Sequence, residues 1–127
     1  MRKIIALVLA SLVLPGAASA ATQSLAHCFT DTQFGNWVAA PDAKTLYFRI
    51  GANRYYRIDL ARECSPLKWG DARLITRMHG GGLVCSAVDL DLKASEGPGG
   101  IVEACFVKGM TELSAAEAAA LPKGLKP

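Results

Sequence analysis

Three carboxylates in the second half of the chain are the first candidates for chemistry. Asp89 and Asp91 are two residues apart in an alternating stretch, so their side chains leave the same face of one predicted strand. Glu103 lies on the next predicted strand, where it could face them. Such a group could hold a hard cation or act as an acid–base pair. We favour the simpler interpretation of a solvated outer face, and we expect no metal site and no cofactor.

The two histidines give little support for catalysis. His27 precedes the first cysteine, and His79 opens a turn of three glycines, where a side chain is ordinarily solvated. No Gly-x-Ser-x-Gly nucleophile motif accompanies them, and no Cys-x-x-Cys pair suggests a zinc site. The sequence therefore favours a protein that is not an enzyme.

Two tyrosines and two arginines form a candidate binding surface. Tyr47 and Arg49 alternate on one predicted strand, and Tyr55 and Arg57 alternate on the next. Both residue types are enriched in protein interfaces, because each combines a large contact area with a directional polar end. The alternative is that cross-strand cation–π pairs only stabilise the hairpin. We refer to these four residues as the Tyr/Arg patch.

The patch depends on a β-hairpin formed by residues 45–50 and 54–60. Only a loop with an odd number of residues pairs the apolar faces of these two segments. A loop at 51–53 places Leu46 opposite Ile58 and puts all four patch residues on the other face, with Asn53 suited to the left-handed position.

The remaining elements follow from alternation and turn residues. We expect strands at 28–37, 71–78, 83–93 and 101–107, with the inward residues Val84, Val88, Leu90 and Leu92 on the third and Val102, Ala104 and Phe106 on the fourth. Ser114 and Glu117 form a capping box for a short helix that ends at Pro122. The elements predict an all-β, mainly antiparallel domain: a small barrel or curled sheet of about six strands with a short C-terminal helix.

The first 20 residues have the order of a cleavable secretory signal peptide. Arg2 and Lys3 precede an apolar run at 4–14, and Ala18-Ser19-Ala20 predicts cleavage after Ala20. That run is too short for a permanent membrane anchor. We expect a periplasmic or secreted protein whose single domain comprises residues 21–127. Without Arg2 and Lys3, 12 cations balance 11 anions, so the net charge gives no case for binding nucleic acid.

Four cysteines in an exported chain predict two disulfides. Three pairings are possible. We favour Cys28–Cys105 with Cys64–Cys85, because the first bond joins the opening and closing strands and the second staples a loop to the start of a strand. A Cys85–Cys105 bond would cross a single hairpin, a geometry that rarely suits disulfides.

The cysteine order and strand spacing carry a resemblance. The sequence resembles a family of small exported proteobacterial proteins of unassigned function in its cysteine positions, its Asp42 before Thr45-Leu46-Tyr47, its Val84-Cys85 with Asp89, and its closing Ser114-x-x-Glu117. The resemblance covers nearly all of residues 21–127. It implies export, paired cysteines and a compact β domain, and it supplies no catalytic residues.

Three functions remain open at this point. The leading hypothesis is a non-enzymatic module that binds a protein or another component of the cell envelope through the Tyr/Arg patch. The second is an inhibitor of an envelope hydrolase that inserts a loop, either 79–82 or 96–100, into the enzyme. The third is a cation-binding or hydrolytic protein that uses Asp89, Asp91 and Glu103. The sequence does not predict the oligomeric state.

Overall fold

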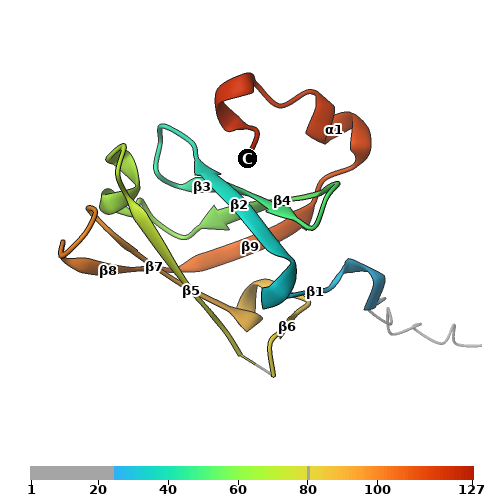
Figure 1. Cartoon of the computed structure of the whole chain (residues 1–127), viewed down its shortest axis with the longest axis horizontal. Coiled ribbons are helices and arrows are strands. Elements are labelled where there is room, and N and C mark those ends of the chain that lie inside the picture. Colours follow the sequence, from blue (N-terminus) through green and yellow to red (C-terminus); the bar gives the residue numbers. More distant parts are fainter. Residues whose placement is uncertain (1–24, 80) are drawn as a thin grey trace, which may run out of the picture.

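The computed structural model describes residues 25–79 and 81–127, which fold into three antiparallel sheets (Figure 1). The predicted signal peptide lies outside the described residues. A four-stranded sheet has the order β2 (Phe34–Ala39), β3 (Thr45–Ile50), β4 (Arg54–Leu60) and β9 (Val107–Glu112). A three-stranded sheet has the order β5 (Arg73–Met78), β7 (Leu90–Ser95) and β8 (Val102–Cys105). The short strands β1 (Phe29–Thr30) and β6 (Leu83–Val84) form the third.

The two larger sheets belong to one curled arrangement. Only Phe106 separates β8 from β9, so the chain passes directly from the three-stranded sheet into the four-stranded one. The strand order is therefore β5-β7-β8 on one side of this bend and β9-β4-β3-β2 on the other. β2 and β5 are the free ends of this series, and no strand among the described residues joins them. The all-β fold class is confirmed as a curled sheet that does not close into a barrel.

The hairpin of β3 and β4 has the predicted register. Leu46 pairs with Ile58, and the Tyr/Arg patch lies on the opposite face as two cross-strand pairs. The loop has three residues, 51–53, as expected. Gly51, with a φ of 62°, takes the left-handed conformation in place of Asn53, because glycine has no Cβ to clash there.

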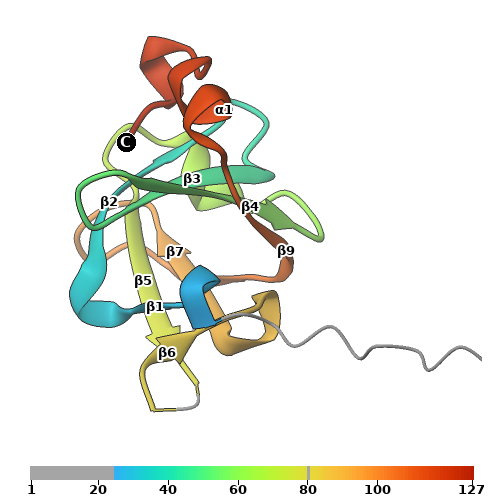
Figure 2. The same cartoon turned by 90° about the vertical axis from the view of Figure 1, so that its right-hand side faces the viewer.

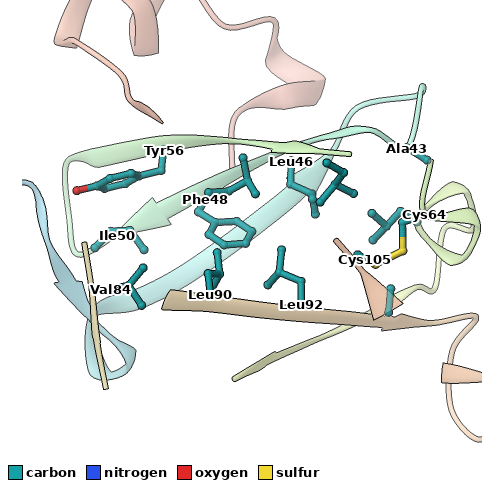
Figure 3. Close-up of a cluster of buried hydrophobic side chains, with 14 of the residues drawn as sticks. Ala43, Leu46, Phe48, Ile50, Tyr56, Cys64, Val84, Leu90, Leu92 and Cys105 are labelled. Atoms are coloured by element: carbon teal, nitrogen blue, oxygen red, sulfur yellow. A yellow bond between two sulfur atoms is a disulfide. The ribbon is translucent and has the colours of Figure 1, made fainter. Parts of the chain in front are cut away.

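The core fills the space between the two larger sheets. In Figure 3, Leu46, Phe48 and Ile50 point from β3 toward Leu90 and Leu92 of β7, and all five are at most 5% exposed. Burying each of these side chains stabilises the fold by about 1.5–3 kcal/mol. At one end of this layer Phe29 of β1 packs on Tyr56 of β4, with ring centroids 5.0 Å apart.

The predicted strand at 83–93 is interrupted. A 3-10 turn, η4 (Ala87–Asp89), separates β6 from β7. The Asp89 carboxylate accepts hydrogen bonds from the backbone N–H groups of Cys85 and Ser86 at 3.1 and 2.9 Å. This local cap competes with strand pairing. Val88, predicted to be inward, is 84% exposed as a result.

The inward face of the last predicted strand is also corrected. Cys105 lies opposite Leu92 and is buried, so the neighbouring positions face outward. Val102 and Phe106 are 51% and 54% exposed. The strand region is also longer than predicted, because β9 continues after the bend to Glu112.

Two disulfides are present, but the predicted pairing is wrong. The bonds are Cys28–Cys85 and Cys64–Cys105 rather than Cys28–Cys105 and Cys64–Cys85. Cys28 precedes β1 and Cys85 follows β6, and the pairing of these two strands brings their Cα atoms within 4.2 Å. Cys64 precedes the 3-10 turn η3 (Ser65–Lys68), which packs near the end of β8. Two disulfides indicate folding in an oxidising, extracytoplasmic environment.

The C-terminal segment packs on the outer face of the hairpin. The capping box of Ser114 and Glu117 begins α1 (Ala115–Ala119) as predicted. Figure 2 shows α1 and the C-terminus beside β3 and β4, on the side away from the core. Ala118 is buried there, and the backbone N–H of Leu113 donates to the Tyr55 carbonyl at 2.8 Å. Among the described residues, no helix is long and apolar enough to cross a membrane.

Candidate functional site

A cleft of about 810 Å³ lies where the curled sheet stays open. One wall is β2 with the residues that follow it, and the other is the connection from η3 to the start of β5. The lining residues are Asn36, Trp37, Val38, Ala39, Ala40, Pro41, Leu67, Lys68, Trp69, Gly70 and Ala72. The residues of the first wall are consecutive, so the backbone of β2 itself borders the cleft. Sequence reasoning missed this site because the two walls come from separate segments.

Two tryptophans contribute to the walls of this cleft. Trp37 is half-buried and packs against the core, whereas Trp69 is 58% exposed. The backbone of Trp69 is held in place, because its N–H donates to the Pro66 carbonyl at 3.3 Å and its carbonyl accepts from Ala72 at 3.1 Å. An exposed tryptophan on a fixed backbone offers a large contact area at a low cost in conformational entropy.

The cleft carries little net charge. Lys68 is its only charged lining residue, and the Lys68 ammonium lies 2.7 Å from the Glu63 carboxylate. The other polar side-chain groups in the lining are the amide of Asn36 and the indole N–H groups of Trp37 and Trp69, and the Asn36 oxygen accepts from the backbone N–H of Trp37 at 2.9 Å. The lining thus offers contact surface and backbone groups rather than a pair of proton-transfer groups.

The Tyr/Arg patch is assembled as predicted, but the C-terminal segment covers much of it. Tyr47 and Arg57 line a hollow of about 270 Å³ together with Leu113, Glu117, Ala120 and Leu121. Tyr55 lies under the Lys126 ammonium, which is 5.9 Å from the ring centroid. Of the four patch residues, Arg57 is exposed, and it pairs with Asp59 at 2.9 Å. The patch thus serves as a packing surface for the C-terminal segment.

Arg49 lies against the neighbouring strand β2. Its Nε atom is buried without a hydrogen-bond partner. A Cβ at Gly35 would lie 3.3 Å from this nitrogen, so the glycine leaves room for the guanidinium. Arg49 therefore packs within the sheet rather than presenting a donor to a ligand.

A network of charged hydrogen bonds joins β4 to β9 and to the first described residues. The Arg54 guanidinium donates to both Glu112 carboxylate oxygens, to the carbonyls of Ala26 and Cys28, and to the Tyr56 hydroxyl. The Tyr56 hydroxyl donates to the His27 carbonyl at 2.6 Å. The His27 Nδ1 atom lies 2.8 Å from Glu112. We call this set the N-terminal clamp, because it holds three consecutive carbonyls at residues 26–28.

Three groups of the clamp, Arg54, Tyr56 and Glu112, are unsuited to proton transfer near neutral pH. Its hydrogen bonds from Arg54 lower the pKa of Glu112 to about 2, while burial raises the pKa of Tyr56 to about 12. Arg54 itself has a raised pKa because it donates to Glu112. An acid or base works best with a pKa near the working pH, so these groups act in binding the main chain.

The three candidate carboxylates do not converge. Asp89 caps η4, and the N–H of Cys85 lowers its pKa. Asp91 lies opposite Arg77 of β5. Glu103 lies opposite Ala94, on the other face of the sheet from Asp91. In residues 25–79 and 81–127, no group of three or more histidine, cysteine or acidic side chains could hold a metal ion.

The histidines lie apart from the main cleft. His27 belongs to the N-terminal clamp. His79 directly follows β5, its side chain is exposed, and its backbone N–H donates to the Asp89 carbonyl at 2.9 Å. Gly80, within the loop considered for hydrolase inhibition, lies outside the described residues.

Comparison with known proteins gives no relative from which a function could be proposed, so the proposal below rests on the fold and the cleft. The resemblance to exported four-cysteine proteins stays a prediction. No family model, curated protein or solved structure matches this chain.

Proposed function

We propose that this protein is a non-enzymatic binding module, periplasmic or secreted, whose ligand site is the cleft between β2 and Trp69. The observation that carries the proposal is Trp69, 58% exposed on a braced backbone at the rim of a cleft of about 810 Å³. Trp69 lines this cleft together with Trp37 and Leu67, so a ligand bound there would bury aromatic and apolar surface of the kind that binding sites use. The disulfides support a location outside the cytoplasm.

The cleft is a better candidate than the Tyr/Arg patch. The patch is already in contact with α1 and the residues after it, so a ligand would have to displace this segment. The cleft requires no such displacement, because its walls leave it open to solvent. A protein or another envelope component remains the expected partner, and it would bind at Trp69.

The test is capture from an envelope extract by the immobilised, disulfide-bonded domain. We expect Trp69→Ala to lose the captured partner and Arg57→Ala to keep it. Both residues are exposed, so equal melting temperatures for the two variants would show that both are folded. A partner kept by Trp69→Ala and lost by Arg57→Ala would contradict binding at the cleft and would favour binding at the Tyr/Arg patch.

Inhibition of an envelope hydrolase is a second candidate, favoured by the loop at 96–100. The Ser95 hydroxyl and the Gly100 N–H both donate to the Gly97 carbonyl, at 3.2 Å each, which braces the loop. Ile101 follows the loop and is 85% exposed. Inhibition of a peptidoglycan hydrolase that Ile101→Asp abolishes would support this function. Full hydrolase activity in excess protein would exclude it for that enzyme.

A further inference from the structure

We infer that the cleft binds an extended peptide, which adds as a new strand to the free edge of β2. This inference rests on the proposed function and names the class of ligand. A strand edge is recognised by another backbone, because its N–H and C=O groups need partners at a fixed spacing. No other class of ligand matches a row of backbone groups so directly.

The first argument is topological. Within residues 25–79 and 81–127, β2 pairs as a strand only with β3 and β5 only with β7, so each has one edge without a strand partner. Both strands lie on the same side of the molecule in Figures 1 and 2, with no strand between them. The cleft is at this opening, bounded by β2 and by the residues leading into β5. An added strand would extend the four-stranded sheet into this space.

The second argument is the direction of the backbone groups on β2. The Ala40 N–H donates to the Thr45 carbonyl at 2.8 Å, so it is directed toward β3. Direction alternates along an antiparallel strand, and the register is regular from Trp37 to Ala39. The N–H and C=O groups of Trp37 and Ala39 are therefore directed away from β3, toward the cleft.

The third argument is that part of this edge is occupied by a replaceable group. The Asn36 side chain accepts from the Trp37 N–H at 2.9 Å, as an edge-protecting residue would. The Ala39 amide, two residues on, has no side-chain acceptor of this kind among the hydrogen bonds of the described residues. Ala39 is thus the position where an incoming strand gains a bond without displacing one.

The walls define the side chains that such a peptide would carry. Trp69 and Leu67 present apolar surface, and Lys68 is neutralised by Glu63. Charge therefore contributes little to recognition. We expect alternate apolar side chains in the peptide, because every second residue of an added strand faces the same wall.

The probe is a displayed library of random 12-residue peptides, selected on the disulfide-bonded domain. The tightest binder is then synthesised, and its dissociation constant is measured for each variant. We expect Ala39→Pro, which removes the outward N–H, to weaken binding about tenfold or more. Asn36→Ala frees the Trp37 N–H and should tighten binding about fivefold. Asn53→Ala, in the hairpin loop, is the matched control and should change nothing.

Two measurements do not depend on the proline variant folding. A peptide methylated on the N–H groups that face β2 should not bind. A peptide methylated on the intervening N–H groups, which face away from β2, should bind as before. On peptide binding, the Ala39 amide should exchange its hydrogen more slowly, whereas the Val38 amide, already bonded to β3, should not change.

The outcomes separate this inference from the proposed function. Binding that requires Trp69 but is insensitive to N-methylation and to Asn36→Ala would overturn strand addition and leave the cleft as the site. Peptides that bind independently of Trp69, or a library without binders, would overturn the inference. An envelope partner insensitive to Trp69→Ala would overturn the proposed function itself.

Discussion

Arg54 and Glu112 are 58 residues apart in the chain, yet the Arg54 guanidinium binds both oxygens of the Glu112 carboxylate, at 2.7 and 3.1 Å. The pair joins β4 to β9, whose pairing shifts register between Asp59 and Leu60. The same guanidinium reaches the carbonyls of Ala26 and Cys28. One side chain thereby connects the beginning of the domain to its last strand.

Arg54→Ala should lower the free energy of unfolding by about 2–3 kcal/mol, because it leaves a half-buried carboxylate without its charged donor. Urea unfolding of the disulfide-bonded protein measures this change. Arg57→Ala removes an exposed ion pair with Asp59 and should cost at most about 1 kcal/mol. Equal costs for the two variants would contradict a special role for the N-terminal clamp.

The stability of the domain should fall in acid through Glu112. Its pKa is lowered from 4.5 to about 2 in the folded state. The folded state therefore binds this proton more weakly than the unfolded state, and the stabilisation is complete above pH 4.5 and is lost between pH 4.5 and 2. The loss should be about 3 kcal/mol. Unfolding curves across this range measure it, and Glu112→Gln should flatten the dependence, leaving a smaller slope from Asp89 and Glu117.

The disulfide pairing can be checked by mass spectrometry of a non-reduced proteolytic digest. We expect linked peptides that contain Cys28 with Cys85 and Cys64 with Cys105. The bonds span 57 and 41 residues, so on the loop-entropy model each contributes about 4 kcal/mol. Replacing Cys28 and Cys85 together by serine should therefore lower stability about as much as replacing the other pair. A Cys28–Cys105 peptide would contradict the fold at the β1–β6 pairing.

Ser114→Ala should loosen the C-terminal segment without affecting the core. It removes the acceptor of the Glu117 N–H at the start of α1, which costs about 1 kcal/mol of helix stability. The Ala118 amide, which donates to the Ser114 carbonyl, should exchange about fivefold faster. The amide of Phe48 in the core serves as the control. Unchanged exchange at Ala118 would show that packing on the hairpin, rather than the cap, holds this segment.

The sequence predicted the parts of the fold that depend on local pattern. Alternation between Thr45 and Leu60 set the hairpin register, because a slip of one residue would turn Leu46 and Ile58 to solvent. The capping box at Ser114 marked the start of α1 for a similar reason, since its bonds join residues only three apart. Both features are decided by residues close together in the chain.

Most of the features that sequence reasoning missed depend on residues far apart, and the cap at Asp89 is a local exception. The cysteine pairing follows from the β1–β6 contact, and each of these strands has only two residues. The N-terminal clamp and the cleft each join segments tens of residues apart. At Asp89, an acidic residue read as part of a strand instead ends one, because its carboxylate binds two nearby N–H groups.

The two disulfides are interleaved along the chain: the first cysteine bonds to the third and the second to the fourth. A chain that emerges amino end first exposes Cys28 and Cys64 before either native partner. Oxidation in order of appearance would therefore join the wrong pair, and reaching the native state would require either delayed oxidation or thiol–disulfide exchange, which takes seconds to hours. The order of the cysteines thus makes the timing of oxidation, relative to the appearance of Cys85, decide whether maturation needs an isomerisation step.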